Sequence, residues 1–384
     1  MPITTADIKN WVQRCGPYGD GLSAVLDEIA AGTDLGGTID PADPAQLGPP
    51  WNSVALRYLQ SGSPRLAMTV YRRAVDHLIQ LQRKHDRRFH KGMFLHNLAN
   101  GHFAAGEPDA AFWFHRLAFV EDVLSRAATD STRPETPATG ALRLFHGVSD
   151  IALDAWVAQA GHAAKLDQTD PEQRIQARYP ELAVVDAARN EAPEAAPLGA
   201  RTDLPVNRLL VEDLDALLDI GDANARGISL ERLTAYLCLT LPGARIANRV
   251  RTKIGELDLI VVLRDAAPSY FIESLGRTLL VECKNWDKPA GVQEVNHFAS
   301  RIRLHGCRAG ILVATSSVSG ARTRGEGLTF GQLLIQGWFH QDGVVVCVID
   351  RDGIRALGAK HRTFSDLVLD RFDQVRFAYS DSTT

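Results

Sequence analysis

The pattern of hydrophobic and polar positions changes character along the chain, and the change lies close to residue 206. Up to about residue 165, long segments of mixed apolar and polar residues are separated by short runs rich in Gly, Pro, Asp and Ser, which is typical of helices and the turns between them. These first 165 residues are therefore predicted to form an all-α domain. The predicted helices lie at about 21–31, 51–61, 64–84, 88–105, 108–128 and 141–164.

Two of the predicted helix pairs resemble each other. Ala67 recurs as Ala111, 44 residues later, and each lies just beyond a Gly-x-Pro turn, at 62–64 and 106–108. Small residues at such positions let neighbouring helices approach closely, and in this respect the segment resembles tetratricopeptide repeats, although their usual period is about 34 residues. The sequence thus favours a repeat-like helical domain with lengthened helices, and a helical bundle without repeats is the alternative.

Residues 166–205 have a different composition, with five prolines among many Ala, Glu and Asp residues. Such a segment packs poorly and is typical of a spacer. We expect a linker between two domains here, partly helical near 182–191.

From about residue 206 to residue 384 the pattern alternates between short apolar runs and longer mixed segments. This predicts an α-β-β-β-α-β order, in which a mixed central sheet is flanked by helices. The predicted helices lie at 228–241, about 290–305 and near 328–338, and the predicted strands at 245–250, 256–263, 278–283, 309–314 and 344–349.

Composition narrows the class of protein. Hydrophobic residues make up 45% and charged residues 23%, which excludes a mostly disordered chain. No apolar run approaches the ~18–20 residues that cross a bilayer, and the first residues lack the pattern of a secretion signal. The five cysteines form no CxxC pair and are expected to be free thiols in a reducing compartment. We therefore expect a cytoplasmic protein with no membrane partner.

The net charge of −4 conceals an uneven distribution. Residues 226–364 contain 19 Lys and Arg against 12 Asp and Glu, whereas the rest of the chain contains 23 against 34. A basic segment with acidic flanks points to a polyanion as the partner of that segment.

Charged residues interrupt two predicted strands that are otherwise apolar. Asp258 lies within 256–263, and Glu282 and Lys284 lie at the end of 278–283 and just beyond it. Residues two apart on a strand share a face, and burying charges on a central strand is costly. If the strands pair, the three side chains converge. Two carboxylates and a main-chain carbonyl, that of Cys283, suit a hard cation such as Mg²⁺, and a nearby lysine can orient or activate a water molecule.

These residues resemble the Asp…(Asp/Glu)-x-Lys signature of the restriction-endonuclease-like nuclease superfamily. The segments Gly255–Val261 and Leu280–Asn285 look most like its Mrr-type and Holliday-junction-resolvase-like branches. The resemblance covers about 226–350. It implies that Asp258 and Glu282 bind the metal ion, that Lys284 is catalytic, and that Glu231, on the helix before the strands, supports a metal ion directly or through water.

Some features depart from that signature or extend it. Twenty-three residues separate Asp258 from Glu282, and the excess is interpreted as a hairpin insertion at Asp265–Arg277. Basic residues around the core can neutralise phosphates without reading sequence. The candidates for contact with DNA are Arg249, Arg251, Lys253, Gln293, Arg301 and Arg322.

Together these features predict an α/β restriction-endonuclease-like core behind an all-α, repeat-like domain. The predicted function is a Mg²⁺-dependent endonuclease, with Mn²⁺ as a substitute, that hydrolyses DNA to 3′-hydroxyl and 5′-phosphate ends, as the resemblance implies. A prokaryotic defence role, regulated by a protein partner or by self-association through the helical domain, is the leading interpretation. A repair or junction-resolving nuclease and a non-catalytic nucleic-acid-binding scaffold are the alternatives, and the residues do not separate DNA from RNA as the substrate.

Overall fold

The structure is a computed structural model of the chain, and it divides into two compact units, Met1–Val184 and Val185–Thr384. It describes residues 4–33, 44–86, 88–126, 132–163, 170–190, 204–252, 255–263, 269–285, 291–316, 330–360 and 363–377. None of the described helices is long and apolar enough to cross a bilayer.

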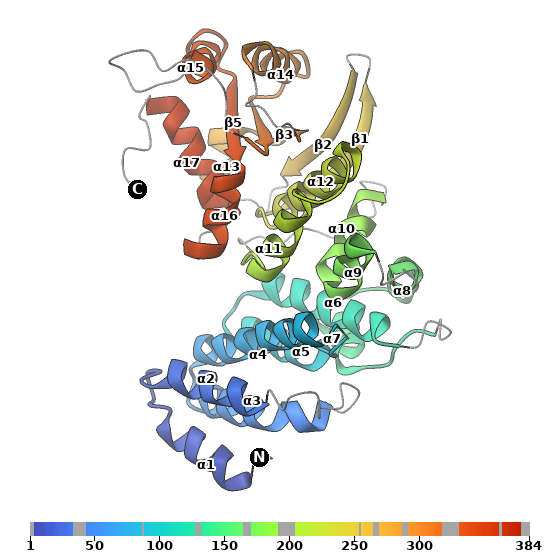
Figure 1. Ribbon diagram of the computed structural model, residues 1–384, viewed down its shortest axis with the longest axis vertical. Helices are drawn as coiled ribbons and strands as arrows, with labels where there is room; N and C mark the ends of the chain where they lie inside the picture. The colour runs from blue at the N-terminus through green and yellow to red at the C-terminus, as the bar shows by residue number, and fades with distance from the viewer. Residues whose placement is uncertain are drawn as a thin grey trace. The chain divides into compact units, whose positions relative to one another are not determined.

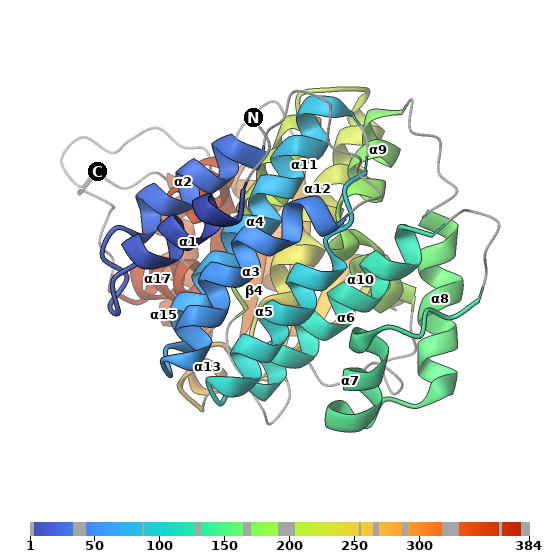
Figure 2. The ribbon, with the colours of Figure 1, turned by 90° about the horizontal axis from the view of Figure 1, so that it is seen from below.

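In the first unit, all the secondary structure that the described residues form is helical. Helices α3, α4, α5 and α6 lie side by side in chain order, and α7 and α8 follow beside α6 (Figure 2). The helices are α1 Thr5–Arg14, α2 Leu22–Thr33, α3 Pro44–Gln60, α4 Pro64–His85, α5 Gly92–Ala104, α6 Pro108–Leu124, α7 Pro137–His146, α8 Asp150–Ala163, α9 Pro171–Arg178 and α10 Pro180–Asn190, the last of which runs into the second unit.

The two Gly-x-Pro turns separate consecutive helices. Gly62 and Gly106 have positive φ angles of 74° and 77°, a conformation that glycine adopts without steric cost, and the following proline is the first residue of α4 or α6. Ala67 and Ala111 are fully buried. The small residues therefore lie where helices pack, as the pattern predicts, and the assignment to a repeat family stays a prediction.

Three local predictions in this unit differ from the structure. Helix α1 was not expected, and the single helix predicted at 141–164 is two helices, α7 and α8, separated by residues 147–149. The predicted linker contains α9 and α10, which bury residues such as Tyr179 and Val185. Pro171 and Pro180 are the first residues of these helices, where the missing N–H costs nothing. Helix α10 corresponds to the helix predicted near 182–191, whereas α9 was not expected; the boundary between the two units falls at residues 184–185, and the assignment of 166–205 as a linker stays a prediction.

A cluster of charges lies inside the first unit. Glu121 of α6 is 0% exposed, and its carboxylate contacts Arg88 Nη2 at 2.6 Å and Lys91 Nζ at 3.1 Å. The main-chain N–H of Lys91 also donates to Glu121, at 3.2 Å, and Arg88 donates to the carbonyl of Ala177 in α9. One buried carboxylate therefore joins α6 to the start of α5, and Arg88 extends the cluster to α9.

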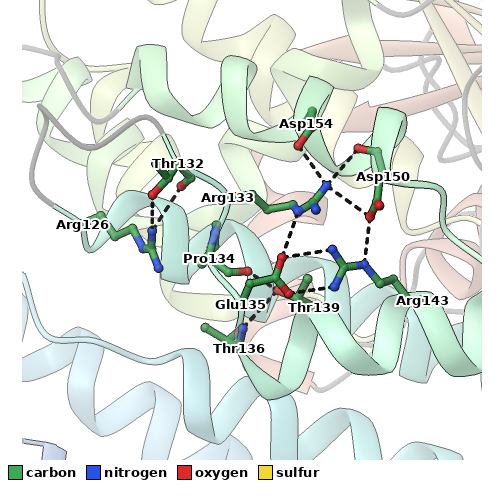
Figure 3. Close-up of polar contacts among 10 residues, drawn as sticks. All are labelled: Arg126, Thr132, Arg133, Pro134, Glu135, Thr136, Thr139, Arg143, Asp150 and Asp154. Carbon is green, nitrogen blue, oxygen red and sulfur yellow. Dashed lines mark hydrogen bonds and ion pairs between the residues drawn. The ribbon is translucent and has the colours of Figure 1, made fainter.

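A second group of charges lies on the surface of the same unit (Figure 3). Glu135 pairs with Arg133 at 3.3 Å and with Arg143 at 2.7 Å, and both arginines also reach Asp150 at the start of α8. The side chain of Glu135 is 61% exposed. The first unit thus contains two glutamates that each pair with two basic side chains, Glu121 in the interior and Glu135 at the surface.

The second unit is built on a five-stranded mixed sheet in the order β1-β2-β3-β4-β5. Figure 1 labels β1, β2, β3 and β5 of this sheet. Strands β1, β2 and β3 are antiparallel neighbours, and β3, β4 and β5 are parallel neighbours. The strands are β1 Ala244–Thr252, β2 Gly255–Leu263, β3 Thr278–Lys284, β4 Ala309–Ala314 and β5 Val345–Asp350. The helices are α11 Arg208–Leu217, α12 Ala223–Leu239, α13 Ser269–Leu275, α14 Val292–Leu304, α15 Phe330–Asp342, α16 Arg351–Lys360 and α17 Phe364–Phe377.

The predicted α-β-β-β-α-β order and mixed sheet are confirmed. The expected hairpin insertion at Asp265–Arg277 is wrong for its described part, because Ser269–Leu275 is the helix α13. Three further helices, α11, α16 and α17, extend the core. Arg351 at the start of α16 binds Asp215 of α11 at 2.5 Å and Asp219 just beyond it at 2.6 Å, so the C-terminal helices are joined to the N-terminal edge of the unit.

Helices α12 and α14 cover opposite faces of the sheet. Consecutive residues on a strand point to opposite faces, and on β3 the side chain of Cys283 lies near Thr234 of α12 while Glu282 contacts Arg301 of α14. Helix α14 packs closely on β4 at Gly310, where an added Cβ would lie 2.6 Å from Ile302 Cδ1 and 2.8 Å from Phe298 Cζ. The lack of a side chain at Gly310 is therefore what lets this helix approach the sheet.

Candidate active site

Two carboxylates are brought together where the pairing of β2 and β3 ends. The last paired residues are Leu259 and Val281, so Asp258 and Glu282 are the next residue on each strand. Because the strands are antiparallel, both lie at the same end of the ladder and are next to each other across it. The predicted convergence of the two acidic residues is thus a property of the strand register.

Asp258 is fixed by the backbone of the neighbouring strand. Its Oδ2 accepts a hydrogen bond of 2.8 Å from the main-chain N–H of Cys283. Burial raises the pKa of Asp258, and the nearby carboxylates of Glu282 and Glu231 raise it further, against the lowering effects of the Cys283 N–H and of Lys284. The ionised form of Asp258 is therefore held among negative charges, where a cation would stabilise it.

Glu282 is buried, with 6% of its surface exposed, and both of its oxygens are engaged. Oε1 lies 2.8 Å from Lys284 Nζ, and Oε2 lies 2.7 Å from Arg301 Nη1. Its charge is therefore compensated twice, once from its own strand and once from helix α14.

Lys284 and Glu231 complete the predicted set. The side chain of Lys284 is 27% exposed, so the ammonium group reaches solvent while it contacts Glu282. Glu231 lies on α12 and is half-buried, and its charge acts on Asp258. The structure thus brings Asp258, Glu282 and Lys284 together, with Glu231 close enough to affect them from the helix.

The donor set fits a hard divalent cation with few protein ligands. It offers two carboxylates and the main-chain carbonyl of Cys283 between Glu282 and Lys284, the kind of oxygen donors that Mg²⁺ takes while it retains several waters. The raised pKa of Asp258 shows a carboxylate that a cation would stabilise. Among the described residues no group of three or more His, Cys, Asp and Glu is arranged to hold a metal ion, and the manner in which Glu231 supports a metal ion stays a prediction.

The predicted DNA contacts have different outcomes. Gln293 is exposed in the first turn of α14. Arg301 is not on the surface: it is 6% exposed and pairs with Glu282, so it was wrongly expected to contact phosphates. Its role in the site was missed, because no spacing in the sequence joins it to Glu282. The remaining candidates lie outside the described residues or have side chains that are not described: Arg249, Arg251, Lys253 and Arg322.

Comparison with known families agrees with this geometry. Residues 225–327 match the model of an Mrr-type catalytic domain, described as a restriction endonuclease. The match contains Glu231, Asp258, Glu282 and Lys284, and it confirms the predicted resemblance for this part of the chain. It supports a nuclease of the restriction-endonuclease type. The comparisons with curated proteins and with solved structures gave no match.

Proposed function

We propose that this protein is a metal-dependent endonuclease that hydrolyses phosphodiester bonds of DNA. The observation that carries the proposal is the meeting of Asp258, Glu282 and Lys284 at the end of the β2–β3 ladder, inside the segment that matches a restriction-endonuclease domain. Two carboxylates and a lysine in a partly buried site are suited to phosphodiester hydrolysis, because that reaction needs cations around a negatively charged phosphate.

Asp258, Glu282 and the carbonyl of Cys283 would hold the metal ion, with Mg²⁺ as the natural ion and Mn²⁺ as a substitute. When bound, a divalent ion supplies positive charge to the phosphate and lowers the pKa of a coordinated water. Glu231, on the separate helix α12, would support the metal ion directly or through a water molecule.

Lys284 would orient the attacking water and stabilise the charge that develops on the phosphate. Its side chain can serve this role because it is partly exposed and is held 2.8 Å from Glu282. The oxygen of the water forms a bond to phosphorus and gives up a proton to solvent as the P–O3′ bond breaks, and the departing 3′ oxygen takes up a proton from solvent. The products are a 3′-hydroxyl and a 5′-phosphate.

We infer that the helical unit regulates cleavage by binding a protein partner or a second copy, and that the protein acts in defence against foreign DNA. The distribution of charge supports a division of labour, because the basic excess lies in 226–364 and the rest of the chain is acidic. An acidic surface repels phosphates, so the helical unit suits a protein partner better than a nucleic acid.

The test is a cleavage assay of the whole chain on plasmid, methylated and branched DNA and on RNA, with Mg²⁺, with Mn²⁺ and with EDTA. We expect Mg²⁺-dependent cleavage of at least one DNA, and none by Lys284→Ala or Asp258→Asn. Preference for branched DNA would favour junction resolution over defence. Full activity of Asp258→Asn, or cleavage that survives EDTA, would contradict the proposed site.

A further inference from the structure

Helix α14 carries a buried arginine into the proposed active site. Arg301 Nη1 lies 2.7 Å from Glu282 Oε2, and the two side chains are 7% and 8% exposed. Two residues further along the same helix, Arg303 pairs with Asp342 at 3.0 Å, but its side chain is 61% exposed. One helix thus presents two ion-paired arginines, of which only Arg301 is removed from water.

The two cations on Glu282 differ in their access to solvent. Lys284 approaches Oε1 from the partly open side, whereas Arg301 approaches Oε2 from the protein interior. A guanidinium group stays protonated at all accessible pH values and has a fixed, planar set of donors. Arg301 therefore supplies Glu282 with a permanent countercharge and a fixed direction.

Helix α14 is also held on the sheet by apolar contacts. Phe298 and Ile302 of the same helix already pack against β4 at Gly310, and both are buried. The contact with Glu282 is an additional polar one, made at a buried carboxylate that lies beside Asp258. Without Arg301, one oxygen of this buried carboxylate would lose its partner, and the side chain would turn away from its present orientation, because an unpaired buried charge is costly.

We propose that Arg301 is the positioning residue of this active site: from the sheet face covered by α14 it holds the Glu282 carboxylate in one orientation, with Oε2 bound to Arg301 and Oε1 bound to Lys284. The inference rests on the proposed metal-dependent nuclease function and adds a residue to it. Arg301 touches neither the substrate nor the metal ion, and it acts only through Glu282.

The test compares Arg301→Met, which keeps length without charge, with Arg301→Lys, which keeps charge without the fork of donors. Arg303→Met is the matched control, because it removes an ion-paired arginine from the same helix at an exposed position. The first measurement is calorimetric titration of the whole chain with Mn²⁺ in the absence of DNA. Groups that orient metal ligands typically change affinity by about 10- to 100-fold, and we expect a loss of that size for Arg301→Met. Arg301→Lys should fall between it and wild type, and Arg303→Met should match wild type.

The second measurement separates kcat from KM on a cleaved DNA. We expect Arg301→Met to lower kcat by at least about tenfold with KM for DNA within about twofold, since Arg301 does not contact the substrate. Unchanged Mn²⁺ affinity and kcat with a lower melting temperature would show a merely structural role and overturn the proposal. Tighter Mn²⁺ binding would overturn it too, because Arg301 would then be a cation that competes with the metal ion.

Two further comparisons separate failure of the Arg301 role from misfolding and from failure of the proposed function. If Arg301→Met does not fold, the comparison of Arg301→Lys with wild type decides, and wild-type Mn²⁺ affinity with wild-type kcat in that variant would overturn the fixed-direction role. If wild type binds Mn²⁺ but cleaves no nucleic acid, the proposed function fails, while the calorimetric comparison still tests Arg301.

Discussion

Replacing Glu121 by Gln tests how the charge cluster inside the helical unit contributes to stability. The change keeps the size of the side chain and removes the charge that Arg88 and Lys91 share, at 2.6 and 3.1 Å. Breaking a buried ion pair by removing one partner typically costs about 3–5 kcal/mol, because the remaining charge is left uncompensated.

The expected cost is lower here because Lys91 can lose its proton. Burial lowers the pKa of Lys91 to about 8, and Arg88 lowers it as well, against the raising effect of Glu121. At pH 7 a lysine with that pKa loses its proton at a cost of only about 1.4 kcal/mol, and removal of Glu121 makes the loss easier. We therefore expect Glu121→Gln to lower the free energy of unfolding by about 2–3 kcal/mol at pH 7. For a unit of this size that corresponds to a decrease of about 4–12 °C in Tm.

The effect should depend on pH in both directions. Burial alone would raise the pKa of Glu121, but Arg88 and Lys91 outweigh it and lower the pKa to about 2. A carboxylate whose pKa is depressed on folding contributes stability that is complete above its unfolded pKa, near 4.5, and is lost as the pH falls toward 2. Above pH 8 the wild-type Lys91 itself becomes neutral. The difference between wild type and Glu121→Gln should therefore be largest between about pH 5 and 7 and decrease on either side.

The assay is thermal and urea unfolding of the whole chain across that pH range, with cleavage per folded molecule as a second readout. Glu135→Gln is the matched control, since Glu135 also contacts two arginines but is exposed (Figure 3). Exposed pairs contribute little, so this control should leave Tm within experimental scatter. An equal change of Tm in both variants would refute the reasoning, as would a Glu121→Gln effect that does not vary with pH.

The remaining predictions concern the second unit. Burial and the charges of Glu282 and Glu231 raise the pKa of Asp258, so its ionised form destabilises the metal-free fold. Asp258→Asn should therefore raise Tm, by an amount that grows as the pH rises above 3.8 and is complete above the folded pKa. A lower Tm of this variant in metal-free buffer at neutral pH would contradict this. Glu231→Ala should reduce cleavage less than Glu282→Ala in parallel Mg²⁺ titrations, since Glu231 lies on a separate helix, and equal losses at saturating Mg²⁺ would make it a direct ligand. DNA binding by Lys284→Ala should equal that of wild type and weaken at least about tenfold between 50 and 200 mM salt, because phosphate contacts release counterions; salt-independent binding would argue against a phosphate-neutralising surface.

The central features of the second unit could be predicted from local sequence. Strands β2, β3, β4 and β5 each contain a short apolar run, and the charges that interrupt two of these runs, at Asp258 and Glu282, are costly enough to indicate function. The register that joins them needs only that β2 and β3 pair as antiparallel neighbours. The strand positions and the polar residues within the strands can therefore be predicted from the sequence without knowledge of the tertiary fold.

Other features depend on contacts between distant segments. Pro171 and Pro180 suggested a spacer, but each begins a helix, and only the burial of residues such as Tyr179 makes those helices stable. Arg301 and Arg303 cannot be distinguished by type or neighbourhood in the sequence. The rotation of α14 about its axis, fixed by its apolar residues against β4, decides which of the two is buried against Glu282.

The close packing at Gly310 has a consequence for how this site can vary. The helix that lies on Gly310 also carries Arg301, so the distance from Arg301 to Glu282 depends on a position in a strand that provides neither residue. In Gly310→Ala the added Cβ would clash with Ile302 and Phe298, and we expect the shift of these α14 side chains to change the placement of Arg301 on the same helix. If Arg301 has the proposed positioning role, substitution at Gly310 is constrained by the active site as well as by folding. In a directed-evolution experiment, Gly310 variants that keep the fold should recover activity through second-site substitutions on α14. The positions of these substitutions would identify the residues through which packing at Gly310 affects the active site.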